Sequence, residues 1–298
     1  MTAARQARTG VLLALTAASL WGVHGAVAAD VFSEVPPARV AQARALITVA
    51  VLVPLAWWRG TLRPRGMAWW LVALGVNLAV VNVTFYWAVD RLGVGPGATI
   101  QFLGPFFVLV WMAGVQRRHV GRVAWLSAGV AVIGVGLVTG AWQLEGSDWV
   151  GFAAGLLSAV TFASYLLLGE HLGARLPVTN VMTWGFVYAS AFWLVVQPLW
   201  SFPTDISSKA WLELLFIGVV GTVIPFLAEF AALARVAVSI VGIIATTEPL
   251  FGAAAAWVLL DQVLSPTQIV GALMVVGAVG SVQRWGIPQH EVPYEAVR

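Results

Sequence analysis

The sequence predicts an all-α polytopic membrane protein, and two observations support that fold class. Hydrophobic residues make up 60% of the 298 residues and charged residues only 10%, whereas an ordinary soluble domain has about 25% charged residues. The few charges leave long apolar runs, each close to the roughly 20 residues that a helix needs to cross a bilayer. A water-soluble surface cannot be built from this composition, so residues 1–298 are expected to form a single membrane domain.

Ten membrane-spanning helices can be drawn, separated by short polar loops. They cover residues 10–29, 37–58, 67–89, 94–116, 121–141, 149–170, 179–199, 210–232, 237–260 and 265–285. The first run follows Arg5 and Arg8 as a signal peptide would, but its length and the nine spans after it favour a retained helix. Residues 286–298 are polar and are expected to form a flexible cytoplasmic tail.

The charges of successive loops alternate, which predicts the orientation of the chain. One side carries twelve basic residues: Arg5, Arg8, Arg59, Arg63, Arg65, Arg117, Arg118, Arg122, Arg175, Arg235, Arg284 and Arg298. The other side carries three, Arg39, Arg91 and Lys209, together with eight acidic residues. Because loops rich in Lys and Arg stay inside the cell, the first side and both termini are predicted to be cytoplasmic. Membrane orientation explains the net charge of +3, and no nucleic-acid partner is expected.

The chain also repeats itself. A shift of 144 residues places Arg91 on Arg235 and Pro105 on Pro249. We infer two five-helix repeats from this correspondence, residues 10–141 and residues 149–285. Because five is an odd number, the second repeat enters the membrane with inverted orientation. Inverted repeats with broken helices and a site at the bilayer midplane are typical of secondary transporters.

The predicted span 237–260 has a polar interruption, TTEP, at its centre. Pro249 has no N–H and clashes with the preceding turn, so a kink is expected there. The carboxylate of Glu248 is costly at this depth unless it faces protein or water. Gly104 and Pro105 occupy the equivalent place in the first repeat. Gly104, Pro105 and Pro249 are therefore the predicted hinge residues.

Several stretches between residues 10 and 285 carry a family resemblance. They are Trp21–Gly22, Arg44 after Pro36–Pro37, FYWAVDRLGVGPGATIQFLGPFF, and TTEPLFGAAAAWVLLDQVLSPTQIVGALMVVGAVG. On these stretches the chain resembles the ten-helix EamA family of the drug/metabolite transporter superfamily, and within it exporters of threonine/homoserine and aromatic amino acids. The resemblance implies export of small metabolites by alternating access. Relatives of this kind often have a glutamate before the helix 4 Gly-Pro, where this chain has Gln101, which weakens the case for proton carriage there.

The candidate substrate-binding residues are polar and aromatic side chains expected inside the bundle. They are Trp21, His24, Asn77, Asn82, Tyr86, Gln101, Tyr165, Trp184 and Glu248. A shift of 141 residues places His24 on Tyr165, so both repeats carry a hydrogen-bonding aromatic group at equivalent points. Neutral donors and acceptors can bind ammonium and carboxylate groups, and Glu248 can anchor a substrate amine or take up a proton. Each residue also has a structural interpretation, because polar side chains in a membrane bond helix to helix for about 1 kcal/mol each.

Two further charged residues are candidates for a gate or for charge pairing. Arg44 lies about two turns into the span 37–58, where it can pair with a substrate carboxylate, snorkel outward or bond helix-terminal carbonyls. Glu229 lies close to the cytoplasmic end of the span 210–232, where it can serve a gate or reach the interface. For Arg44 and for Glu229, the functional and the structural interpretation both stay open.

Together these features predict a bacterial inner-membrane exporter of small metabolites, above all amino acids, that works by alternating access and, with few buried ionisable groups, by facilitated diffusion. Alternatives are drug or metabolite efflux by proton antiport, exchange of sugar phosphates or nucleotide sugars, an intramembrane enzyme and a non-transporting scaffold. Phosphate requires several basic groups, and only Arg44 lies within a span. Cysteine is absent and the four histidines are scattered, so no metal site, cofactor or catalytic residue is expected. The expected partners are the small-molecule substrate and membrane lipids, and a monomer is compatible with the pattern.

Overall fold

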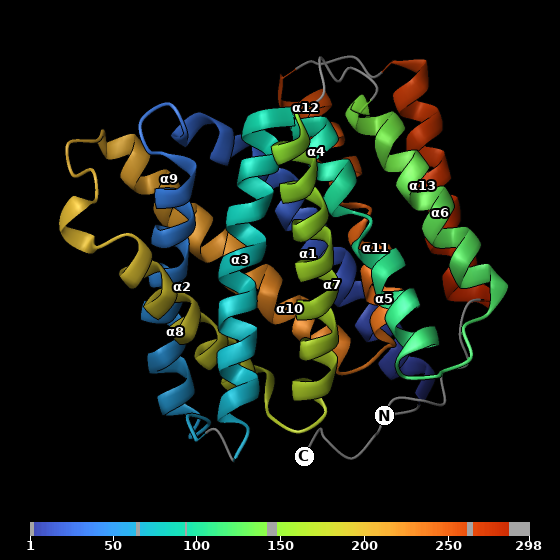
Figure 1. Ribbon diagram of the computed structural model, residues 1–298, viewed down its shortest axis with the longest axis horizontal. Coiled ribbons are helices and arrows are strands. Elements are labelled where there is room, and N and C mark those ends of the chain that lie inside the picture. Colours follow the sequence, from blue (N-terminus) through green and yellow to red (C-terminus); the bar gives the residue numbers. More distant parts are fainter. Residues whose placement is uncertain (1–2, 64–65, 93, 142–147, 261–264, 286–298) are drawn as a thin grey trace.

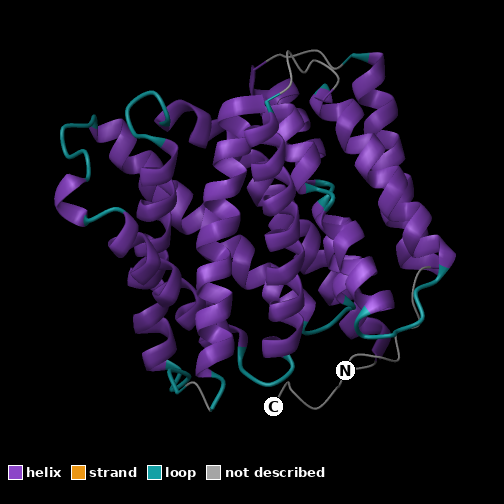
Figure 2. Cartoon of the chain, in the orientation of Figure 1, coloured by secondary structure: helices purple, strands orange, loops and turns teal. Residues whose placement is uncertain are grey.

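The computed structural model describes residues 3–63, 66–92, 94–141, 148–260 and 265–285. Within these ranges the regular structure is helical and contains no strand (Figure 2). The described helices are α1 (Ala3–Val31), α2 (Pro37–Trp58), α3 (Ala68–Leu92), α4 (Val94–Gln101), α5 (Gly104–Gly114), α6 (Arg122–Thr139), α7 (Trp149–Gly173), α8 (Val178–Val196), η2 (Leu199–Ser201), α9 (Ser208–Gly218), η3 (Val219–Val223), α10 (Ile224–Leu233), α11 (Val238–Ala245), α12 (Glu248–Leu260) and α13 (Pro266–Trp285). The predicted tail, residues 286–298, lies outside the described residues.

Nine stretches of the described chain are long and apolar enough to cross a membrane. They run from Pro37–Trp58 to Pro266–Trp285 and coincide with the predicted spans to within a few residues. The remaining predicted span, residues 10–29, lies within α1, which is 29 residues long. The polytopic all-helical class is confirmed, and a tenth span in α1 remains a prediction.

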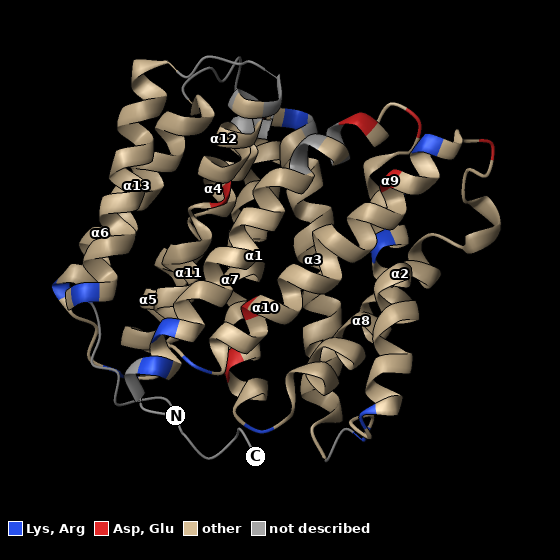
Figure 3. Cartoon of the chain, turned by 180° about the vertical axis from the view of Figure 1, so that it is seen from behind, with Lys and Arg blue, Asp and Glu red and all other residues tan. Residues whose placement is uncertain are grey.

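The helices stand side by side between two ends of opposite charge character. Figure 1 shows α3 and α7 in the middle, α2, α8 and α9 on one flank, and α6 and α13 on the other. Most basic residues lie at the lower end of the bundle, and acidic residues prevail at the upper end (Figure 3). We call these the basic end, where α5 ends and α6 begins, and the acidic end, where α1 ends and α2 begins. The positive-inside rule predicts that the basic end is cytoplasmic.

Two broken helices occupy corresponding places in the sequence. Helices α4 and α5 are separated by two residues, and so are α11 and α12. The starts of α4 and α5, at Val94 and Gly104, recur 144 residues later as Val238 and Glu248. The breaks therefore follow the register of the predicted repeat, and the helix is interrupted where a kink was expected.

At the break before Glu248, two threonines form additional hydrogen bonds to the preceding helical turn. The Thr246 hydroxyl donates to the carbonyl of residue 243 at 2.6 Å, and the Thr247 hydroxyl donates to the carbonyl of residue 244 at 2.7 Å. The backbone N–H groups of both threonines bond to the same two carbonyls. The carbonyls of residues 243 and 244 thus keep donors where the regular helix stops, and an unpaired carbonyl would be costly in a membrane.

A third interruption was not predicted. A single π-helical turn, η3, separates α9 from α10. Pro225 follows it at the start of α10, and Gly221 lies within it. A π-turn shifts the hydrogen-bond ladder by one residue and often marks a functional site. Here it places Gly221 and Thr222 against α1 and α2.

Helix α11 and a group of aromatic rings are buried in the half of the bundle near the basic end. All eight residues of α11 are buried, whereas the described side chains of α12 from Glu248 to Ala255 are partly or fully exposed. An aromatic cluster fills this half of the bundle. Its members are Trp21, Phe162, Tyr165, Phe186, Phe226 and Phe230. We call this buried half, which contains α11 and the aromatic cluster, the closed half of the bundle.

Candidate functional site

Arg44 is the centre of the polar interior. It projects from α2 and is only 8% exposed. Its Nε donates to the Thr222 hydroxyl at 2.9 Å, and its Nη2 donates to the Gly221 carbonyl at 3.2 Å. The same guanidinium reaches α3, where Nη1 donates to Asn82 Oδ1 at 3.3 Å and to the Tyr86 hydroxyl at 3.4 Å. One side chain thus joins α2 and α3 to the π-turn of the second half.

The neighbours of Arg44 are themselves held in place. Asn82 Nδ2 donates to the carbonyl of Leu78 at 2.6 Å, which turns Oδ1 toward the guanidinium. The Thr222 hydroxyl donates to the carbonyl of Ile217 at 2.7 Å, so its lone pairs remain for Arg44. The predicted candidates Asn82 and Tyr86 therefore lie together, as their four-residue spacing on a helix requires.

His24 stands on the other side of the π-turn. Its Nδ1 lies 2.7 Å from the carbonyl oxygen of Trp21, and because a carbonyl only accepts, Nδ1 carries the proton. A Cβ atom at Gly221 would lie 2.7 Å from the imidazole Cδ2, so only glycine lets the ring pack this closely. Trp21 turns into the aromatic cluster, with its ring 5.0 Å from that of Phe226.

Glu248 is the first residue of α12 and faces the interior. Its carboxylate interacts electrostatically with Arg44 and with Glu229, and it is partly exposed. No side chain of the described ranges forms a hydrogen bond or ion pair with this carboxylate. Helix α1 packs directly on the break, since a Cβ atom at Gly22 would lie 2.5 Å from the Glu248 carbonyl oxygen.

Tyr165 of α7 and Glu229 of α10 form a buried pair in the half of the bundle near the basic end. The Tyr165 hydroxyl donates to Glu229 Oε2 at 2.9 Å, and Glu229 is 1% exposed. Phe230 stacks on the Tyr165 ring with 6.3 Å between centroids. Glu229 therefore lies inside the closed half of the bundle and does not reach the interface.

The remaining candidates divide between the interior and the periphery. Gln101 donates through Nε2 to the Ser158 hydroxyl at 2.9 Å, which ties α4 to α7. Asn77 has a buried Oδ1 without a hydrogen-bond partner in the described chain. Trp184 lies elsewhere: its Nε1 donates at 2.6 Å to the carbonyl of Leu62, beyond the end of α2.

The predicted hinge residues of the first half are buried beside α7 and α11. A Cβ atom at Gly104 would lie 2.4 Å from Phe162 Cδ1. Pro105, which follows it, is 3.5 Å from the corresponding position at Gly242. The break in the first half thus packs against both a helix of the second half and the other broken helix.

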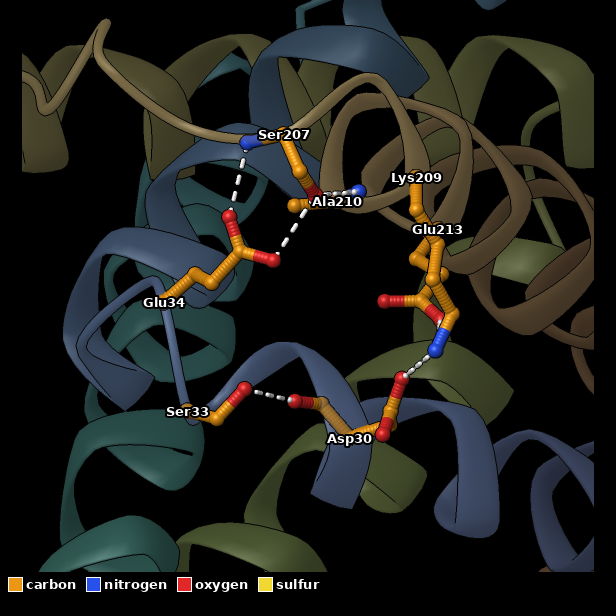
Figure 4. Close-up of polar contacts among 7 residues, drawn as sticks. All are labelled: Asp30, Ser33, Glu34, Ser207, Lys209, Ala210 and Glu213. Carbon is orange, nitrogen blue, oxygen red and sulfur yellow. Dashed lines mark hydrogen bonds and ion pairs between the residues drawn. The ribbon is translucent and has the colours of Figure 1, made fainter.

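A polar network at the acidic end connects the two halves around the connection between α1 and α2 (Figure 4). The Glu34 carboxylate accepts hydrogen bonds from the Ser207 N–H and hydroxyl, both at 2.7 Å. These bonds lower the pKa of Glu34 below its ordinary value. Lys209 forms an ion pair with Asp30 at 2.5 Å and approaches Glu213 at 3.6 Å.

Sequence reasoning missed the π-turn and therefore missed Gly221 and Thr222 as partners of Arg44. The available signal was Pro225, whose missing N–H frees a carbonyl one turn earlier. No group of three or more metal-ligating side chains occurs in the described part of the chain. The arrangement offers one cation, two carboxyl groups and several neutral donors, which is suited to binding a small polar molecule rather than to covalent chemistry.

Comparison with known proteins identifies the family. Residues 8–140 and 149–282 each match the EamA-like transporter family. The chain is 26% identical over 282 residues to the pseudopaline exporter CntI of Pseudomonas aeruginosa, covering 93% of this chain and 96% of that protein. It is 25% identical over 212 residues to the threonine/homoserine exporter RhtA of Escherichia coli, covering 70% and 68% of the two chains.

A solved crystal structure shares the fold with a TM-score of 0.80 at 19% identity, covering 93% of this chain and 97% of that one. The apolar helices and the transporter matches make this chain a multi-pass protein of the inner membrane. The chain belongs to the EamA-like transporter family of the drug/metabolite transporter superfamily.

Proposed function

We propose that this protein exports amino acids and metabolites of similar size and polarity by alternating access between its two five-helix halves. The observation that carries the proposal is the hydrogen-bonded centre around Arg44, which contains groups from α2 and α3 of the first half and from η3 of the second. A polar centre shared by two halves is where a substrate can be exposed to one side of the membrane at a time.

Two features of the helices support this mechanism. The breaks before Gly104 and Glu248 lie at matching positions of the sequence, so both halves have a point at which a helix can bend. The burial of α11 and of the aromatic cluster near the basic end supports a state closed toward the predicted cytoplasm. The opposite state requires the aromatic cluster around Tyr165 to separate. The named relatives RhtA and CntI are exporters of small metabolites, which supports the substrate class.

Counterflow in proteoliposomes tests the proposal. Vesicles loaded with unlabelled threonine are diluted into labelled threonine, and the experiment is repeated with homoserine, phenylalanine and tryptophan. Transient accumulation of label above that in protein-free vesicles is expected for at least one of these. Absence of exchange for the whole panel, with protein that remains monodisperse and helical after reconstitution, would refute amino-acid export.

Proton-coupled efflux is the second candidate, and the buried pair of Tyr165 and Glu229 favours it. A carboxyl that is 1% exposed among aromatic rings is poorly placed to carry a charge. Opening of the closed half would bring water to it and allow the proton to leave. In that case an imposed pH gradient drives accumulation and Glu229→Gln abolishes the drive, while counterflow without a gradient continues. Equal accumulation with and without the gradient would leave facilitated diffusion as the mechanism.

A further inference from the structure

We propose that Arg44 is the carboxylate anchor of the substrate site, so that the protein selects substrates with a free carboxylate group. This inference rests on the proposed export function and specifies the chemical class that the same site accepts.

The first argument is the charge of Arg44. Its guanidinium is 8% exposed, yet all four groups that it contacts are neutral. The ion pairs of the described residues do not include Arg44. The carboxylate of Glu248 interacts with Arg44 electrostatically but forms no ion pair with it. A buried cation whose direct partners are all neutral carries a large desolvation penalty. An anionic ligand that enters the site would offset that penalty, whereas a neutral ligand would not.

The second argument is the geometry of the guanidinium. The bond from Nε to Thr222, at 2.9 Å, and that from Nη2 to Gly221, at 3.2 Å, lie in the normal range of N–H···O distances. The two bonds of Nη1, at 3.3 and 3.4 Å, lie beyond it. The π-turn therefore fixes the orientation of Arg44, and Nη1 is the nitrogen whose contacts are most easily exchanged.

The third argument is the number of donors. A guanidinium has five N–H groups, and four of them account for the contacts with Thr222, Gly221, Asn82 and Tyr86. One N–H of Nη2 therefore has no acceptor within the described chain. It lies beside the weakly bonded Nη1, and these two nitrogens form the edge that binds a carboxylate in bidentate fashion.

The partners of Nη1 suit this exchange. Asn82 and Tyr86 are partly exposed, so their side of the guanidinium is the accessible one. When a carboxylate displaces the Tyr86 hydroxyl from Nη1, that hydroxyl can donate to the carboxylate instead. A lysine at position 44 would keep the charge but lose the planar two-nitrogen edge. A single arginine also matches a monoanionic carboxylate better than a phosphate, which takes several cations.

The experiment compares competitors that differ only in the carboxylate. Counterflow of labelled threonine by the unmodified protein is measured against threonine, threonine amide and threonine methyl ester, all of which keep the amine and the side chain. Loss of a charge-assisted pair corresponds to about tenfold or more in affinity. Half-inhibition by the amide and by the ester is therefore expected at concentrations at least about tenfold higher than for threonine.

Variants on the same helix provide the residue test. Arg44→Gln should lose the discrimination between threonine and its amide, and Arg44→Lys should retain only part of it. Arg39→Gln is the matched control: Arg39 lies on α2, contacts Gln42 and Ser201 near the acidic end, and its loss should leave the discrimination intact.

The outcomes separate the two proposals. Equal competition by threonine and its amide in the unmodified protein overturns the carboxylate anchor while leaving amino-acid export standing. Discrimination that persists in a folded Arg44→Gln protein overturns the assignment to Arg44. Absence of exchange for every amino acid overturns the proposed function and the anchor with it. The competitor comparison requires no variant, so a failure of Arg44→Gln to fold does not affect it.

Discussion

Replacing Gly22 by alanine should push α1 away from the break in front of α12. A Cβ atom at Gly22 would lie 2.5 Å from the Glu248 carbonyl oxygen, 2.7 Å from the Gly252 nitrogen and 2.8 Å from Phe251 Cβ. Comfortable contacts of carbon atoms are about 3.5–4.0 Å, so the two helices must separate by about 1 Å. Two of the three obstacles are backbone atoms, which no change of rotamer can move. Overpacking of this kind costs about 1–3 kcal/mol.

Gly129→Ala is the matched control, because Gly129 is also within a helix but a Cβ atom there would have nothing within 4 Å. Both variants gain the same helix propensity of about 1 kcal/mol, so the difference between them isolates the steric cost. Thermal unfolding in detergent should show Gly22→Ala melting below the unmodified protein and Gly129→Ala at or above it. Threonine counterflow should fall only in the first variant, since the displaced α12 carries Glu248. If Gly22→Ala melts at or above Gly129→Ala, α1 does not contact the break as described.

Three further predictions concern the pair in the closed half and the acidic end. Tyr165→Phe removes the hydrogen bond to Glu229 and should lower the free energy of unfolding by about 1–3 kcal/mol; a double-mutant cycle with Glu229→Leu measures the coupling, and additive losses would contradict the pair. Asp148 caps the start of α7, where its carboxylate accepts hydrogen bonds from the Gly151 and Val150 N–H groups and pairs with Arg91. These contacts lower the pKa of Asp148 below its ordinary value, so the stability that the cap contributes is present above the ordinary pKa and is lost as the pH falls through the lowered one. Melting temperatures from pH 7 to pH 3 should therefore fall less steeply for Asp148→Asn than for the unmodified protein. Lys209→Gln breaks the ion pair between Lys209 and Asp30, whose side chains are 69% and 53% exposed. Because water and salt screen exposed pairs strongly, the melting temperature of this variant should change little and the salt dependence of unfolding should shrink.

Much of the fold could be predicted from the sequence because membrane helices follow from local composition. Apolar runs of sufficient length place the spans, and the basic loops predict the orientation. The break before Glu248 was also predictable, because Pro249 removes a backbone donor whatever surrounds it. Its counterpart before Gly104 follows from the repeat, since the two breaks are 144 residues apart.

The site was only partly predictable, because its contacts depend on packing between distant segments. Asn82 and Tyr86 were grouped correctly by their spacing on one helix, but their common partner, Arg44, lies on another. The π-turn forms where the guanidinium of Arg44 bonds the Gly221 carbonyl and where the imidazole of His24 packs against Gly221. No periodic pattern in the sequence signals either contact. Both are tertiary contacts.

Trp184 shows the converse difficulty. A tryptophan deep in a predicted span can line a cavity or bond a neighbouring segment, and composition does not distinguish these roles. In the structure its N–H is taken up by the carbonyl of Leu62. The role of Trp184 therefore depends on the path of the segment that follows α2. That path is set by the packing of α2 against α8.

The charges of the interior are divided between the two halves in a way that bears on mechanism. Arg44 belongs to the first half, and the carboxyl groups of Glu229 and Glu248 belong to the second. A bound zwitterion whose carboxylate meets Arg44 presents its ammonium group to the second half, where Glu248 has no ion-pair partner among the described residues. Such a ligand contacts both halves with opposite charges and stabilises whichever arrangement brings them together. A ligand that lacks either charge interacts with one half only and therefore has a smaller effect on their relative position. Under the proposed alternating access, the carboxylate would therefore contribute both to binding and to the balance between the two states.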